Sequence, residues 1–244
     1  MLAAAACTYT GRVEKLMYVG WKPDDVTIAD LRAALLGKTA DALRAAGARG
    51  LTVLLADDAA VPGLRIAQRD PTAVVSIWLD SALRRGPLEA ILASTLDRLA
   101  GWLVLESVPL PNAAHPVVLG ERVPGLYTVA FLEKPADLDY ADWLARWQGD
   151  HTAVAIETQR TFVYVQNVLA RPLMPDAPPW VAIVEEGFPA EAATDPLRFF
   201  AASTAEEVAA QQSRMTASVQ RFIDFARFET LPMSAYVLAQ PAFS

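Results

Sequence analysis

One segment of the chain repeats itself 112 residues further on, and this repeat constrains the fold more than any other feature. Lys22–Thr39 aligns without a gap on Lys134–His151, with seven identical residues in eighteen positions. Self-similarity at a fixed spacing indicates a duplicated structural unit. A chain of 244 residues is long enough to hold two such units, each with its own share of a core.

Hydrophobic periodicity and helix-capping signals predict the same order of elements, β-α-β-β-α-β, in both halves. In the first half we expect strands at 13–19, 50–56, 73–79 and 102–106, and helices at 27–46 and 87–99. In the second half we expect strands at 125–132, 161–168, 180–186 and 227–231, and helices at 139–154 and 204–222. This order is that of the ferredoxin-like unit.

The repeat and the element order together predict an α+β fold class. We expect two tandem ferredoxin-like (βαββαβ) repeats, fused into an intrachain dimeric α+β barrel by packing their two bare sheet faces against each other. The expected domains are an N-terminal repeat at 10–110, a proline-rich linker at 111–123 and a C-terminal repeat at 124–244. The pattern also allows a homodimer of the fused chains.

Composition excludes several classes of partner. The formal net charge is −7, and no basic cluster interrupts the acidic balance, so nucleic acid and anionic membrane surfaces are not expected as partners. No apolar run reaches the roughly 18 residues of a membrane-spanning helix. The single cysteine, Cys7, cannot form an intrachain disulfide. These features favour a soluble protein in a reducing cytoplasm.

The second copy of the repeat carries a stripe of unusual side chains. Trp143, Trp147 and His151 are spaced four apart, so they share one face of the helix that Asp139 can cap. At the aligned positions the first copy has Leu31, Leu35 and Thr39. A functional site is therefore expected in the second half, and the first half is expected to hold a degenerate version of it.

Three motifs of the second half give the chain a family resemblance. They are Trp147-x-x-x-His151 after Lys134-Pro135, Tyr164-Val-Gln166-Asn167, and a strand that ends in Glu185-Glu186. Over roughly residues 125–240 the chain resembles the EthD family of the dimeric α+β barrel superfamily. The resemblance implies small-molecule proteins linked to catabolism of hydrophobic or aromatic compounds and to polyketide-like dehydration or cyclisation.

Each candidate site residue has a functional and a structural interpretation. His151 suits a general acid or base, because imidazole titrates near neutral pH, or it is a core histidine with both nitrogens satisfied. Tyr164 and Gln166 share one face of a strand and could hold a carbonyl or hydroxyl group, unless they are polar residues of an edge strand. Trp143 and Trp147 would wall the pocket, or be plain core.

A regular strand turns one of the adjacent carboxylates Glu185 and Glu186 inward, where it could orient His151 or serve as a second base. The alternative is that both lie at the wet end of the strand.

The sequence shows no metal-ligand spacing, no glycine-rich phosphate loop and no dinucleotide fingerprint, so no cofactor is expected. Haem ligation by His151, which occurs through histidine elsewhere in that superfamily, is disfavoured. The expected function is a cofactor-independent lyase, dehydratase, cyclase or isomerase that acts on a small aromatic or polyketide-like hydrophobic substrate. The alternatives are an EthD-type oxidoreductase or monooxygenase accessory protein and a non-catalytic binder of hydrophobic metabolites.

Overall fold

The computed structural model describes residues 13–241. Cys7 and the first three residues of the expected 10–110 domain lie outside this part of the chain. Within it, no helix is long and apolar enough to cross a lipid bilayer.

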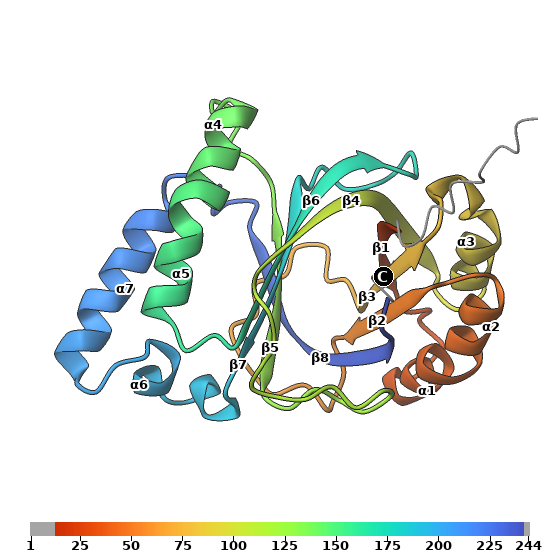
Figure 1. The fold of residues 1–244 in the computed structure, drawn as a ribbon, viewed down its shortest axis with the longest axis horizontal. Coiled ribbons are helices and arrows are strands. Elements are labelled where there is room, and N and C mark those ends of the chain that lie inside the picture. The colour runs from red at the N-terminus through yellow and green to blue at the C-terminus, as the bar shows by residue number, and fades with distance from the viewer. Residues whose placement is uncertain (1–12, 242–244) are drawn as a thin grey trace, which may run out of the picture.

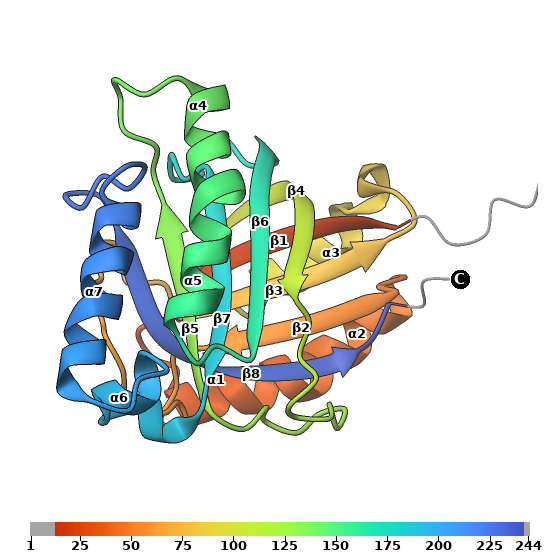
Figure 2. The same cartoon turned by 60° about the vertical axis from the view of Figure 1, so that its left-hand side comes forward.

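Eight antiparallel strands form a closed barrel, in the order β1-β3-β2-β8-β5-β7-β6-β4. Their bounds are β1 Glu14–Trp21, β2 Gly50–Leu55, β3 Ala73–Leu79, β4 Arg98–Leu110, β5 Leu126–Leu132, β6 Val163–Pro172, β7 Ala182–Phe188 and β8 Glu229–Ala239. In Figure 2, β5, β6 and β7 run up the picture while β1, β2 and β3 run across it.

The helices form two layers on opposite sides of the barrel (Figure 1). One layer comes from the first half: α1 Ile28–Ala34, the π-helical segment η1 Leu35–Thr39, α2 Ala40–Ala45, the 3-10 turn η2 Ala82–Arg84 and α3 Gly86–Ala93. The other comes from the second half: α4 Tyr140–Leu144, the π-helical segment η3 Ala145–His151, α5 Thr152–Thr158, the 3-10 turn η4 Ala190–Ala193, α6 Pro196–Phe199 and α7 Ala205–Val219.

The expected fold class, two tandem ferredoxin-like repeats fused into an α+β barrel from two sheets packed face to face, is wrong. The structure is a single closed eight-stranded antiparallel barrel. The strands of the two halves are hydrogen-bonded into one sheet, because β2 pairs with β8 and β4 pairs with β6. The expectation failed because apolar periodicity locates strands but does not identify their partners.

Several element bounds also differ from the sequence prediction. The helix expected at 87–99 ends at Ala93, and β4 starts at Arg98 and continues to Leu110. The last strand, expected to be short and followed by a separate tail, is one continuous strand, β8. Strand β6 extends to Pro172, four residues beyond the expected end, because it pairs along the elongated β4.

The apolar core is divided by the sheet into three main clusters. The barrel interior holds side chains such as Val129, Phe131 and Trp102. A second cluster packs the first-half helices on the outside of β1, β2 and β3, and a third does the same for the second half. Strand residues alternate between the two faces, so every other position faces a helix layer. The candidate site lies on the helix-facing side of the second half.

Candidate functional site

A cavity of about 440 Å³ lies between the second-half strands and their helix layer. Its volume is in the usual range for small-molecule sites, about 300–1,000 Å³. Most of the wall is apolar, including Phe188 and Val184 from β7, Met215 and Val219 from α7, and Phe222 from the loop that follows. Such a wall suits a hydrophobic ligand.

A row of three polar side chains crosses this apolar wall. Thr128 of β5, Glu186 of β7 and Tyr164 of β6 are direct cross-strand neighbours, and all three line the cavity. Cross-strand neighbours on one face have Cβ atoms only about 5 Å apart. The row therefore places a hydroxyl, a carboxyl and a phenol side by side within an otherwise apolar space.

The carboxyl group of Glu186 has an unusual acidity. Burial raises the pKa of Glu186 from the ordinary 4.5 to about 7, since the apolar walls disfavour the charged form. Burial, followed by the charge of Glu186, also raises the pKa of Tyr164. Near neutral pH, Glu186 thus exists in both protonation states while Tyr164 keeps its proton. A carboxyl group whose pKa lies near 7 is able to act as either acid or base at neutral pH.

His151 ends the π-helical segment η3 and lines the cavity. Its Nδ1 lies 3.0 Å from the hydroxyl oxygen of Ser218, and its ring packs 4.8 Å from that of Phe222. Burial lowers the pKa of His151 to about 4, so the imidazole is neutral at physiological pH. In the first half, Thr39 occupies the aligned position and its hydroxyl lies 2.9 Å from that of Thr95. Ser218 belongs to α7, whereas Thr95 lies in the turn after α3.

The other residues that the sequence singled out lie close to the cavity. Trp147 lines it, whereas Trp143 packs behind at 5.0 Å between ring centroids and donates its indole N–H to the Phe222 carbonyl. Gln166 is buried beside the wall, where its amide donates to the Thr152 hydroxyl at 2.8 Å and to the Tyr164 hydroxyl at 3.4 Å.

The two adjacent glutamates point in opposite directions. Glu186 faces the cavity, whereas Glu185 faces the barrel interior. There Glu185 accepts a hydrogen bond from the Asn167 amide at 3.0 Å and lies 3.6 Å from the Lys15 ammonium. The same ammonium donates to Asn167 at 2.7 Å and to Glu106 at 2.5 Å. Glu185 belongs to this buried ionic network and does not contact the cavity wall.

The two halves carry side chains of different size at aligned positions of β1 and β5. Shifted by 112 residues, Leu16 and Tyr18 of β1 align with Thr128 and Ala130 of β5. Leu16 pairs across the strands with Ile77, as Thr128 pairs with Glu186. Sequence reasoning missed Thr128 and Ala130. The same 112-residue shift, extended from the helix into the preceding strand, would have found both.

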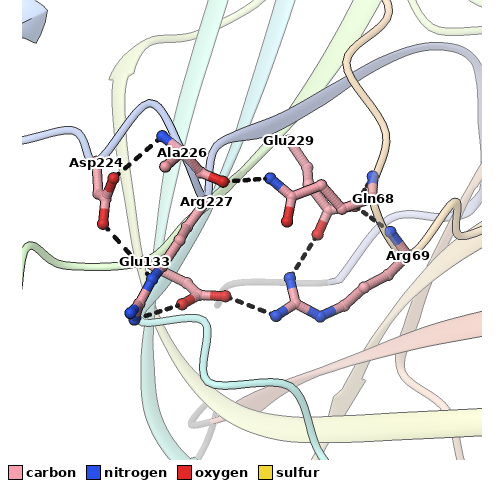
Figure 3. A network of polar contacts seen from close by, with 7 residues as sticks. All are labelled: Gln68, Arg69, Glu133, Asp224, Ala226, Arg227 and Glu229. Atoms are coloured by element: carbon pink, nitrogen blue, oxygen red, sulfur yellow. Dashed lines mark hydrogen bonds and ion pairs between the residues drawn. The ribbon is translucent and has the colours of Figure 1, made fainter.

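The first half contributes one wall of the cavity through the loop between β2 and β3. Gly63 and Leu64 of this loop line the cavity, and Ile66 forms a bridge with Thr230, which also lines it. Ion pairs fix the loop a few residues further on, where the Arg69 guanidinium joins Glu229 at 2.7 Å and Glu133 at 2.8 Å (Figure 3).

Glu229 is fully buried and held as a charged acceptor. Although burial opposes ionisation, the backbone N–H groups of Arg69 and Gln68 and the Arg69 guanidinium lower the pKa of Glu229. Arg227 lies 3.5 Å from the other oxygen of Glu133 and 3.6 Å from Asp224 (Figure 3). We call these groups the Arg69 network. Across residues 13–241 no cluster of His, Cys, Asp and Glu side chains could hold a metal ion.

Fold and site together define a closed antiparallel barrel with a ligand-sized, mostly apolar cavity beneath one helix layer. An anthrone oxidase-like protein has a similar structure, with a TM-score of 0.54, 10% identity and 95% of each chain covered. So does a protein described as a monooxygenase by similarity from Fusobacterium nucleatum, with a TM-score of 0.50, 7% identity, and 96% of this chain and 97% of that chain covered. No family model and no curated protein matches the chain. The structural likeness shows a common fold.

Proposed function

We propose that the protein is a small-molecule enzyme that moves protons on an aromatic or polyketide-like substrate in this cavity, with Glu186 as the acid/base. The observation that carries the proposal is the Glu186 carboxyl in an apolar cavity, with a pKa raised to about 7. General acid–base catalysis works best when the pKa of the catalytic group lies near the working pH.

Two side chains of the polar row, Glu186 and Tyr164, provide the base and the hydrogen-bond donor that an enolisation requires. The Glu186 carboxylate takes a proton from the carbon next to a substrate carbonyl, and the electron pair moves onto the carbonyl oxygen. The protonated Tyr164 hydroxyl donates a hydrogen bond to that oxygen, where charge develops. The Glu186 carboxylic acid then returns the proton to another carbon, which completes an isomerisation, or to a departing hydroxyl, which releases water.

His151 has a different role in this proposal from the one its sequence position suggested. With a pKa of about 4 and a hydrogen bond to Ser218, the neutral imidazole shapes the cavity wall and orients the ligand. The proton is carried by Glu186. Trp147 forms the apolar floor, and Gln166 fixes the Tyr164 hydroxyl. No resident cofactor takes part in these steps.

The EthD resemblance and the two structural neighbours favour an oxidative alternative that starts with the same deprotonation. An anthrone oxidase-like protein shares the fold, and the carbanion left by proton loss can pass electrons to molecular oxygen. One O₂ per substrate would convert a methylene group to a carbonyl and yield one water. Oxygen uptake with anthrone as the probe distinguishes this outcome from isomerisation or dehydration.

The test is hydrogen exchange into a simple enolisable ketone that fits the cavity. In D₂O, the wild-type protein is expected to accelerate deuterium uptake by 2-tetralone beyond the buffer rate, measured by mass spectrometry. Glu186→Gln keeps the size of the side chain but removes its titrating proton, so the rate is expected to fall by about 10²–10⁴-fold. The exposed Glu191, next to the cavity-lining Ala192, provides a matched control, since Glu191→Gln makes the same chemical change outside the wall.

Wild-type exchange at the buffer rate, or an unchanged rate in Glu186→Gln, would refute the proposal. A protein that binds 2-tetralone without accelerating exchange would be a non-catalytic binder.

A further inference from the structure

The cavity wall contains a carboxyl group but, among the described residues, no lysine or arginine side chain. Its polar members, within the described residues, are Thr128, His151, Gln159, Tyr164, Glu186 and Thr230. Neither lysine nor arginine lines it. Any negative charge on a ligand would therefore have no positively charged partner in the wall.

The arginines of the Arg69 network are already paired with carboxylates. In the Arg69 network, Arg69 forms ion pairs with the buried carboxylates of Glu229 and Glu133 (Figure 3). Arg227 forms ion pairs with Glu133 and Asp224. Turning the Arg69 guanidinium toward a ligand would leave the buried Glu229 without its charged partner, which is strongly unfavourable. Arg69 is thus not available to an anionic ligand.

An anionic ligand would lose its water in this cavity and meet the Glu186 carboxylate instead of a cation. Both effects oppose binding, because apolar surroundings disfavour an unpaired charge and because like charges repel more strongly away from water. An uncharged ligand of the same shape suffers neither effect. Its carbonyl or hydroxyl oxygen can instead accept from the Tyr164 hydroxyl.

We propose that the site selects uncharged aromatic ketones and phenols over carboxylates, and that Glu186 is the residue that enforces this choice. The proposal rests on the proposed function and deepens it, since it defines the substrate class. It excludes aromatic acids and substrates carried on phosphate-bearing groups from the cavity. Selection by charge and catalysis by proton transfer would then reside in the same side chain.

The charge on Glu186 should make this selectivity depend on pH. Thr128 from β5 and Tyr164 from β6 are the cross-strand neighbours of Glu186, and His151 from the helix layer lines the same cavity. Tyr164 keeps its proton and His151, with a pKa of about 4, stays neutral through the range in which Glu186 titrates. Discrimination against anions should therefore be strongest above about pH 7 and weaken below it.

Two isosteric probes test the proposal, 2-naphthamide and 2-naphthoate, with affinities measured by isothermal titration calorimetry. At about pH 8.5 the wild-type protein is expected to bind the amide at least about tenfold more tightly than the carboxylate. Glu186→Gln is expected to tighten carboxylate binding about tenfold and to change amide binding less than about threefold. Glu191→Gln should leave the ratio unchanged.

A second measurement uses only the wild-type protein, so it does not depend on how the variant folds. Its preference for the amide should shrink at about pH 5.5, where Glu186 is protonated and naphthoate is still ionised. Equal affinities at high pH, no binding of either probe, or a ratio unaffected by both pH and Glu186→Gln would each overturn the proposal. If Glu186→Gln abolishes exchange into 2-tetralone but leaves the ratio unchanged, the proposed function stands and the charge selection fails.

Discussion

Replacement of Tyr18 by alanine should open, in the first half, a cavity like the one in the second. The Tyr18 ring is fully buried against β4, so close to Gly101 that a Cβ atom there would lie 2.6 Å from it. Its hydroxyl donates to Glu89 at 3.1 Å. If Tyr18 fills the space that Ala130 leaves empty in the second half, the variant should contain a void able to hold a phenol ring.

The size of the effect follows from the buried ring. Truncation of a large buried aromatic side chain costs about 3–5 kcal/mol, and the lost hydrogen bond adds about 1 kcal/mol. For a chain of this length the melting temperature should fall by about 8–24 °C. Urea denaturation gives the free energy directly. Tyr140→Ala is the matched control, because Tyr140 is 44% exposed and its loss should cost at most about 1 kcal/mol.

Addition of p-cresol provides the second readout. An apolar cavity of this kind binds small aromatic molecules, and a ligand at about 100 times its dissociation constant restores about 2.7 kcal/mol. The ligand should stabilise Tyr18→Ala more than it stabilises Tyr140→Ala, and the difference isolates the new cavity. A loss below about 1 kcal/mol in Tyr18→Ala, or equal stabilisation of both variants, would refute the idea that Tyr18 plugs a second copy of the site.

Three further predictions follow. His151→Asn should lower 2-tetralone exchange less than about tenfold, since a pKa of about 4 makes the imidazole a weak base; a loss of about 10²-fold would make His151 the acid/base instead. The pKa of Glu186 is about 7 in the folded protein and the ordinary 4.5 in the unfolded chain. The stability that Glu186 contributes, at most about 3 kcal/mol, should therefore be present below about pH 4.5 and be lost as pH rises to about 7. Urea titrations of Glu186→Gln should lack this change. Arg69→Met should destabilise the protein by about 3–5 kcal/mol in the same assay, because the buried Glu229 loses its charged partner and Glu133 loses one of two; a loss under about 1 kcal/mol would show that the Arg69 network is not what fixes the loop.

Local features of the fold could be predicted from the sequence. The side chains of Thr27, Asp139 and Thr204 accept backbone N–H groups at the starts of α1, α4 and α7, as the capping signals indicated. Capping involves residues two or three positions apart, so the sequence contains all the relevant information. The pairings β2–β8 and β4–β6 join distant segments, and no local pattern identified them. The fold class was therefore predicted incorrectly although most elements were located.

For the candidate site too, the sequence predicts local features but not those that depend on distant segments. Strand alternation predicted that one of Glu185 and Glu186 would face a pocket, but which one depends on how β7 lies between β5 and β6. The protonation states could not be predicted at all. Desolvation by the surrounding walls moves the pKa of Glu186 up and that of His151 down, and those walls are assembled from several separate elements.

The position of β8 in the barrel has a consequence for biosynthesis. This last strand lies between β2 and β5, and its residue Thr230 lines the cavity. During translation, β2 emerges long before β8, and the edge of β2 that pairs with β8 has no partner until β8 has also emerged. Unpaired strand edges and pairings between distant segments slow folding and expose newly made chains to aggregation. Ligand-binding competence should therefore appear only once β8 has emerged and paired, in one late step that closes the barrel and the cavity together.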